Sequence, residues 1–204
     1  MLSKSIRFKN YRLIKNKKIN KKIKDDLRVF LKEENQILQS LSQNYKNSYS
    51  QKLISKLKVF FHIRIIGMGG SNLGAESIYD FLKHKIKKKF YFINNLQTKI
   101  YKFIQKKKYL NLIISKSGNT IETISNANVL IKNKDKNIII TENKISYLFS
   151  IAHQLKAEII HHNNFIGGRY SVLSEVGMLP AELMGLNIKK FKQINNLIKN
   201  KEFI

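Results

Sequence analysis

The sequence contains no cysteine, no tryptophan and a single proline. Without cysteine there are no disulfides, thiolate zinc sites or cysteine nucleophiles, and the composition fits a reducing compartment. Long apolar runs are also missing. The best one, Val59 to Gly70, contains His62 and Arg64 and falls short of the roughly 18 residues of a membrane span. The basic amino-terminal end lacks the apolar region of a secretory signal, so we expect a cytoplasmic protein.

Acidic residues are scarce: 13 stand against 39 basic ones, which gives a formal net charge of +26. Such a charge is typical of proteins that bind nucleic acids or anionic membranes. However, 34 of the basic residues are lysine and only 5 are arginine, whereas nucleic-acid readers favour the planar fork of arginine. Lysine, isoleucine and asparagine are abundant together, as in the product of a coding sequence rich in A and T. We therefore do not expect nucleic acid or a membrane as the partner.

The 204 residues, 43% of them hydrophobic, are enough for one good-sized core. Residues 1–58 indicate a basic helical segment, with one helix over 22–41 from the spacing of its apolar residues. Residues 59–204 alternate between apolar patterns typical of strands and patterns typical of helices. We predict strands at 59–67, 109–115, 136–143 and 157–162. We predict helices at 95–104, 120–132 and 145–155. This alternation predicts an α/β fold, a doubly wound parallel sheet, whose ligands bind beyond the carboxyl ends of the strands.

The first such strand end is the sequence GMGGSNLGA, which begins at Gly67. It matches neither the dinucleotide fingerprint nor the P-loop, because Asn72 and Ala75 stand where those motifs need glycine and lysine. Glycines nevertheless allow a ligand to approach the backbone, and Ser71 places a hydroxyl at a helix N-terminus, which favours an anion. The alternative is a tight turn in which Ser71 merely caps the helix.

The second strand end is the sequence SKSGNTIET, from Ser115 to Thr123. Ser115, Ser117 and Thr120 place hydroxyls beside the start of a predicted helix, where backbone N–H groups can bind a phosphate. Lys116 could add charge or could face solvent. The alternative is a hydroxyl-rich capping turn, but two such turns in one sheet favour a phosphate site.

A third stretch, GGRYSVLSEVGMLP from Gly167 to Pro180, follows in the same chain. In this order the three motifs resemble the glucose-6-phosphate isomerase family, and the third resembles that family's own signature almost residue for residue. The resemblance extends over about 59–187. It implies that 59–204 form a sugar-isomerase (SIS) domain, an α/β sandwich, preceded by the helical segment 1–58.

The resemblance also implies roles for particular residues. The sugar phosphate would be held by the glycine turn and the hydroxyl-rich loop, that is by Gly70, Ser71, Ser115, Lys116, Ser117 and Thr120. Arg169, delivered by Gly167 and Gly168, would lie beside the reacting carbons and stabilise an enediolate. The reaction implied is the interconversion of glucose 6-phosphate and fructose 6-phosphate, a step of glycolysis and gluconeogenesis. We expect no cofactor and no metal ion.

The expected general base is not evident. In that family the catalytic glutamate, a histidine and a late lysine come from segments well beyond the arginine, and the histidine comes from the partner of a dimer. We interpret Glu122, Glu175 and Glu182 as surface or capping residues. His161 and His162 are better placed, although core or edge positions are commoner for histidine. The sequence thus predicts a truncated or split isomerase, completed by a second half or a homodimer. The alternatives are a non-catalytic sugar-phosphate-binding domain and, from composition alone, a nucleic-acid-associated protein.

Overall fold

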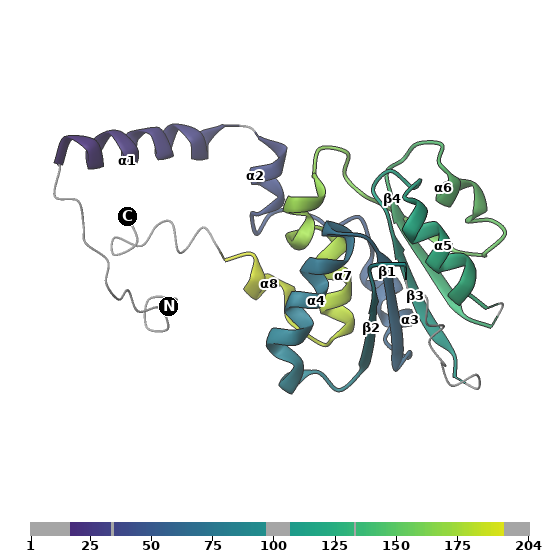
Figure 1. Cartoon of the computed structure of the whole chain (residues 1–204). Helices are drawn as coiled ribbons and strands as arrows, with labels where there is room; N and C mark the ends of the chain where they lie inside the picture. The colour runs from purple at the N-terminus through teal and green to yellow at the C-terminus, as the bar shows by residue number, and fades with distance from the viewer. Residues whose placement is uncertain (1–16, 34, 97–106, 133, 194–204) are drawn as a thin grey trace. The chain divides into compact units, whose positions relative to one another are not determined.

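In a computed structural model, which describes residues 17–33, 35–96, 107–132 and 134–193, five parallel strands pair in the order β2-β1-β3-β4-β5 (Figure 1). The strands are β1 (His62–Gly67), β2 (Lys89–Ile93), β3 (Tyr109–Ile114), β4 (Lys136–Thr141) and β5 (Glu158–His161). Four of them confirm the predicted strands to within a few residues. β2 was not predicted, and most of the helix predicted at 95–104 lies outside the described residues.

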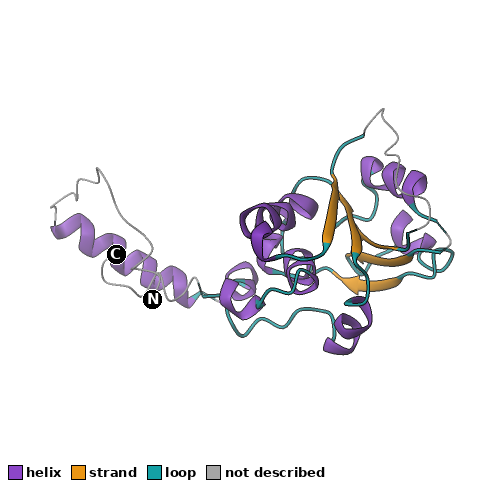
Figure 2. Cartoon of the chain, turned by 90° about the horizontal axis from the view of Figure 1, so that it is seen from below, coloured by secondary structure: helices purple, strands orange, loops and turns teal. Residues whose placement is uncertain are grey.

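The remaining elements are helical. They are α1 (Lys17–Lys32), α2 (Gln36–Ser40), α3 (Gln51–Leu57), α4 (Gly70–Leu82), η1 (Lys83–Lys85), α5 (Ile121–Leu130), α6 (Tyr147–Ile151), η2 (Gly168–Leu173), α7 (Glu175–Leu183) and α8 (Ile188–Phe191). Helices lie on both faces of the sheet, which confirms the doubly wound α/β fold (Figure 2). None of the described helices is long and apolar enough to cross a membrane.

The chain divides into two compact units, residues 1–45 with 189–204, and residues 46–188. The first unit contains α1 and α2. The prediction of one continuous helix over 22–41 was wrong, because Asn35 begins a new helix. Its side-chain oxygen accepts a hydrogen bond from the backbone N–H of Ile37 at 2.9 Å, which satisfies one of the free donors at the start of α2. The second unit contains α3 and the whole sheet.

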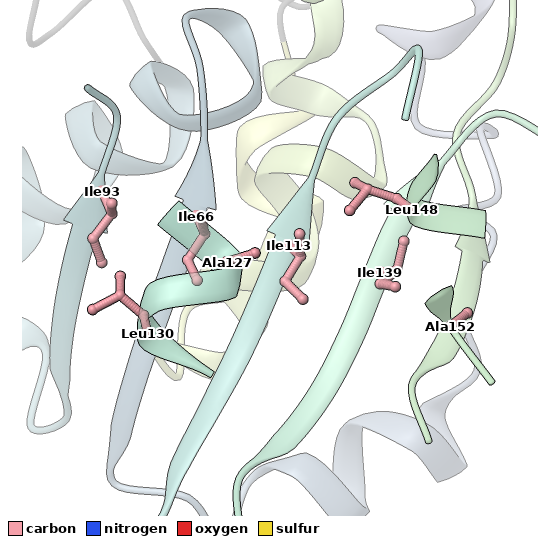
Figure 3. Close-up of a cluster of buried hydrophobic side chains, with 8 residues drawn as sticks. All are labelled: Ile66, Ile93, Ile113, Ala127, Leu130, Ile139, Leu148 and Ala152. Carbon is pink, nitrogen blue, oxygen red and sulfur yellow. The ribbon is translucent and has the colours of Figure 1, made fainter. Parts of the chain in front are cut away.

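One side of the sheet packs against α5 and α6. Isoleucines from four neighbouring strands meet the apolar residues of these helices in a single buried cluster, made of Ile66, Ile93, Ile113, Ala127, Leu130, Ile139, Leu148 and Ala152 (Figure 3). On the other side, α4 contacts β1, β2 and α7, and α7 contacts α3. Because both sides are covered, β1, β3 and β4 are almost wholly buried, as in other parallel sheets.

A buried polar cluster fixes the pairing of the central strands. Arg64 on β1 is 1% exposed, and its guanidinium lies 3.2 Å from a carboxylate oxygen of Asp135 and 2.8 Å from the carbonyl oxygen of Leu130. Its side chain stacks on the Tyr109 ring at 3.6 Å. A one-residue slip of β1 would leave this charge buried without its partner, which costs about 3–5 kcal/mol. The cluster therefore keeps the carboxyl ends of β1 and β3 level.

Candidate phosphosugar site

Two of the predicted turns open side by side at one edge of the sheet. Gly67, the last residue of β1, pairs with Ile114, the last residue of β3, in a parallel register. The glycine turn and the hydroxyl-rich loop therefore begin at neighbouring points. This is the arrangement that a single anion bound by both turns requires.

The glycine turn differs in detail from the expectation. Gly69, in a left-handed conformation with φ of 55°, occupies the cap position, and α4 begins at Gly70. Ser71 lies one residue inside the helix, so the alternative of Ser71 as a capping residue is wrong. Its hydroxyl forms no hydrogen bond with the described residues, and its side chain is half-buried. The hydroxyl is consequently available to a ligand at the helix N-terminus.

In the hydroxyl-rich loop, two of the three predicted hydroxyls meet. The hydroxyl oxygens of Ser115 and Thr120 lie 2.9 Å apart, and Ser115 also accepts a hydrogen bond from the backbone N–H of Gly118. Ser117 is exposed, and its hydroxyl accepts from the backbone N–H of Asn119 instead. Gly118 has a φ of 68° and packs so closely on Ser146 that a side chain there would clash. The loop is thus shaped by a glycine at its tightest point.

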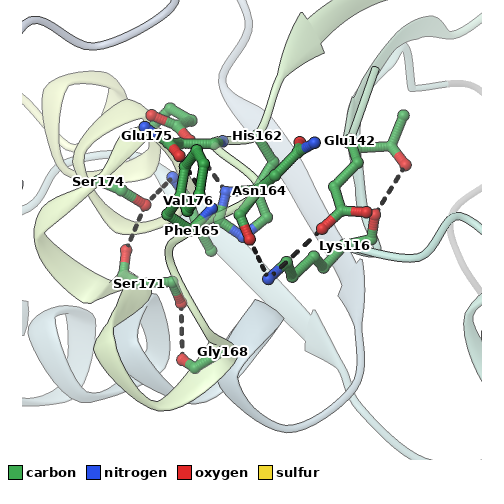
Figure 4. A network of polar contacts seen from close by, with 12 residues as sticks. Lys116, Glu142, His162, Asn164, Phe165, Gly168, Ser171, Ser174, Glu175 and Val176 are labelled. Carbon is green, nitrogen blue, oxygen red and sulfur yellow. Dashed lines mark hydrogen bonds and ion pairs between the residues drawn. The ribbon is translucent and has the colours of Figure 1, made fainter. Parts of the chain in front are cut away.

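Lys116 spans the space between this loop and the segment that leads to the double glycine. Its amino group donates to the carbonyl oxygen of Asn164 at 2.7 Å and lies 3.4 Å from a carboxylate oxygen of Glu142 (Figure 4). Lys144 binds the other oxygen of Glu142 at 3.0 Å. Burial opposes ionisation of Glu142, but the two lysines outweigh it, so the pKa of this carboxyl is lowered. Lys116 is therefore held in place at the edge of the site.

The double glycine lies directly against the glycine turn. A side chain on Gly70 would collide with the backbone carbonyl of Gly168, so the two segments meet at a point where only glycine fits. The hydroxyl of Ser171 donates to the carbonyl oxygen of Gly70 at 3.2 Å and to that of Gly168 at 2.8 Å. Arg169 follows immediately, is exposed, and forms no ion pair with the described residues. The fold therefore brings the backbone next to Arg169 into contact with Gly70.

The remaining carboxylates and histidines fall into two groups. Glu122, Glu182 and His161 are half-buried or exposed, and Glu182 accepts a hydrogen bond from Gln51 at 3.3 Å. The interpretation of Glu175 as a surface or capping residue was wrong. It is fully buried at the start of α7 and lies 2.9 Å from the Nδ1 atom of His162, which is 2% exposed. Burial opposes ionisation of Glu175, but hydrogen bonds from His162 and from backbone N–H groups outweigh it, so the pKa of this carboxyl is lowered.

The family model for phosphoglucose isomerase matches residues 11–201 of this chain. The chain belongs to the phosphoglucose isomerase family. Glucose-6-phosphate isomerase of Acholeplasma laidlawii is 34% identical over 148 residues, which are 63% of this chain and 34% of that protein. The probable glucose-6-phosphate isomerase of Methanococcus maripaludis is 33% identical over 172 residues, 75% of this chain and 38% of that protein. The chain thus spans about a third of the length of these phosphoglucose isomerase relatives.

Solved structures share the fold of this phosphoglucose isomerase domain. A hypothetical protein of Thermus thermophilus has a TM-score of 0.65 at 18% identity, over 88% of this chain and 47% of that one. Tagatose-6-phosphate ketose/aldose isomerase of Escherichia coli has a TM-score of 0.54 at 14% identity, over 85% of this chain and 46% of that one. The parallel sheet with helices on both faces is therefore an architecture that this chain shares with both solved structures. Among the described residues, no group of three or more histidine, aspartate or glutamate side chains could hold a metal ion.

Proposed function

We propose that this chain is the phosphate-binding part of a glucose-6-phosphate isomerase, which interconverts glucose 6-phosphate and fructose 6-phosphate through an enediol. The observation that carries the proposal is the contact between Gly70 and Gly168. It joins the anion-binding turn after β1 to the segment of Arg169, and the hydroxyl-rich loop after β3 opens at the same edge. The names of the full-length relatives support the choice of substrate.

In this proposal the phosphate of the substrate lies between the two turns. Ser71 and the backbone of Gly70 bind it from one side, and Ser115, Ser117 and Thr120 bind it from the other. The N-termini of α4 and α5 both point toward this edge, and their partial positive charge favours an anion. Lys116 adds a positive charge at the rim.

Arg169 would act at the other end of the substrate. When a proton leaves C2 of the open-chain aldose, negative charge develops on the oxygen atoms of the enediolate. A guanidinium beside these atoms stabilises that charge, and it stays protonated because the pKa of arginine exceeds about 12. Arg169 is exposed and unpaired among the described residues, so its donors are available to a ligand.

The general base would come from another polypeptide segment. Glu175 and His162 are buried and bound to each other, so neither reaches a substrate beside Arg169. Exposed apolar side chains follow the carboxyl end of every strand, namely Met68, Leu73, Leu96, Ile121, Ile145, Tyr147, Phe165 and Tyr170. Such a surface is typical of one that another protein surface covers. We propose that a complementing second half, or a second copy in a homodimer, covers it and supplies the base, in the cytoplasm.

The burial of Glu175 also favours a second candidate. Without a base of its own, this chain could bind a sugar phosphate and act as a sensor or regulator. The two functions share the phosphate site and differ only in turnover.

The proposal is tested with the purified chain in two assays. Calorimetric titration with fructose 6-phosphate is expected to give saturable binding. A coupled assay for fructose 6-phosphate formation is expected to give turnover only when the missing part of a full-length relative is added in trans. Arg169→Lys should reduce that turnover far more than it weakens phosphate binding, because lysine keeps the charge and loses the fixed fork. Turnover by the single chain at the roughly 1–1,000 per second of ordinary enzymes would refute the proposal that the general base comes from another polypeptide segment. Binding without turnover after complementation would favour the sensor.

A further inference from the structure

We propose that Glu175 is a positioning residue for Arg169: together with His162 it closes the base of the segment 163–174 and so fixes where the guanidinium lies. The inference rests on the proposed function only for the identity of the ligand that Arg169 contacts. The pair itself lies outside the motif positions for which the sequence predicted a role.

The pair closes this segment from its two ends. His162 is the last residue before it and Glu175 the first residue after it, and their side chains meet at 2.9 Å with 2% and 0% of their surface exposed. The same Glu175 oxygen, Oε1, accepts a hydrogen bond from the backbone N–H of Asn163 at 3.2 Å. One carboxylate oxygen therefore holds the end of β5 against the start of α7, with Arg169 between them in the sequence.

A chain of hydrogen bonds extends from this base to the arginine. Ser174, next to Glu175, donates from its hydroxyl to the carbonyl oxygen of Ser171 at 2.7 Å. Ser171 donates in turn to the carbonyl oxygen of Gly168 at 2.8 Å, and that carbonyl belongs to the peptide bond of Arg169. Figure 4 shows these residues as one connected set. A shift at the base of the segment would consequently reach the backbone of Arg169.

The other half of the segment is held against the phosphate loop. The carbonyl oxygen of Asn164 accepts from the Lys116 amino group, and the side chain of Asn163 accepts from the backbone N–H of Phe165 at 3.0 Å. The segment is thus fixed to the hydroxyl-rich loop near its beginning, to the glycine turn through Ser171, and to the core through Glu175. Of these three attachments, only the one through Glu175 is a fully buried charged group.

A buried charge of this kind is not needed for stability alone. Apolar residues of similar volume often replace a buried ion pair with no loss, or a gain, in stability. The surroundings of Glu175 in α7 are apolar, with Val176, Met178 and Leu179 all buried. What a buried, hydrogen-bonded carboxylate adds over apolar packing is a defined geometry. That geometry is imposed on the segment that carries the arginine.

The experiment compares Glu175→Ala and Glu175→Gln with the control Glu158→Gln, whose exposed glutamate lies at the far end of β5. The ligands are inorganic phosphate, which needs only the two turns, and 6-phosphogluconate, whose carboxylate would also reach Arg169. In Glu175→Ala, the affinity for 6-phosphogluconate should fall about tenfold while that for phosphate changes less than about twofold. Glu175→Gln, which keeps an acceptor oxygen, should recover most of the loss, and Glu158→Gln should match the wild type. Equal losses for both ligands, or none, would overturn the inference.

A second measurement does not depend on any ligand. Amide hydrogen exchange of residues 163–174 should accelerate in Glu175→Ala, while the amides of β1 and β3 keep their wild-type rates. Faster exchange throughout the sheet would mean that Glu175 only stabilises the fold, and would overturn the inference. If the wild type bound neither ligand, the proposed function would fail, and the exchange pattern would still decide whether Glu175 holds the segment of Arg169.

Discussion

Gly70 and Gly168, 98 positions apart in the sequence, touch through their backbones, and a methyl group on Gly70 would collide with the carbonyl of Gly168. The glycine turn after β1 and the segment of Arg169 are therefore joined without any side chain between them. Close contacts between backbones cannot be relieved by a change of rotamer. Gly70 thus ties together the two parts of the proposed site.

Replacing Gly70 should therefore separate the two parts. We expect Gly70→Ala to destabilise the protein by about 1–3 kcal/mol, as overpacking does, and to abolish measurable binding of fructose 6-phosphate. Gly167→Ala is the control for stability, since the nearest atom to its added methyl group would be a Tyr170 ring carbon at 3.7 Å. Thermal unfolding and calorimetric titration check both variants. Equal stability and equal binding in Gly70→Ala and the wild type would show that the contact has no role.

Two threonines at the start of α5 allow a test of the proposed phosphate site: Thr120 caps the helix and Thr123 lies in its first turn. Thr120 Oγ1 faces Ser115 Oγ, whereas the hydroxyl of Thr123, one turn further on and buried, has no partner among the described residues. Thr120→Val should weaken phosphate binding about tenfold or more, because hydrogen bonds to charged groups contribute about 1.5–3 kcal/mol.

Thr123→Val is the matched control. It should leave phosphate binding unchanged and hold or raise the melting temperature, since it removes a buried hydroxyl without a partner. Phosphate titration of both variants, followed by thermal unfolding, makes the comparison. If the two substitutions weakened binding alike, the phosphate would not lie at the start of α5.

The sequence predicted most of the sheet because four of its strands each contain at least two consecutive apolar residues. β2 was missed for a physical reason: its five residues, KFYFI, follow several lysines and form an edge strand that is only partly buried. The break between α1 and α2 was missed as well, although Asn35 is a residue that commonly begins helices. Apolar spacing continued across that break and concealed it.

The three motifs predicted the positions of the candidate site but not its connections. That the turns after β1 and β3 share an edge follows from a parallel sheet, and the structure has this arrangement. The contact of Gly70 with Gly168 and the burial of Glu175 depend on tertiary packing, which local sequence does not specify. A glutamate surrounded by apolar residues in SEVGMLP, with a histidine 13 residues before it, was the one available signal for the buried pair.

Lys116 and Lys144 share one carboxylate but differ in a second contact. Both bind Glu142, at 3.4 Å and 3.0 Å, and Lys116 also donates to the carbonyl of Asn164. Lys116→Met should weaken 6-phosphogluconate binding about three- to tenfold, because it removes both a charge at the rim and an attachment of the arginine segment. Lys144→Met should have no effect beyond a small change in salt dependence. Titration of both variants with 6-phosphogluconate at two salt concentrations distinguishes these effects. Equal losses of affinity in the two variants would mean that only the net charge matters.

The buried Glu175 should make the protein sensitive to acid. Its pKa is lowered in the folded state, so its ionised form stabilises the fold fully above the unfolded-state value of about 4.3, and this contribution is lost as the pH falls through the lower folded value. In Glu175→Gln this dependence disappears. Below pH 5, the free energy of unfolding should therefore fall less steeply with pH in the variant, by up to about 1.4 kcal/mol per pH unit for one proton.

Urea unfolding at intervals from pH 6 to pH 3 measures this difference, with Glu158→Gln as the control because its exposed carboxylate forms no ion pair among the described residues. A residual slope should persist in Glu175→Gln, since the pKa of Glu142 is lowered too, by Lys144 and Lys116. In the double variant Glu142→Gln with Glu175→Gln, the free energy of unfolding should depend on pH still less steeply below pH 5. If Glu175→Gln and Glu158→Gln gave the same slope as the wild type, the pKa of Glu175 would be the same in the folded and unfolded protein. The hydrogen bonds by which Glu175 holds the Arg169 segment would then not exist in solution.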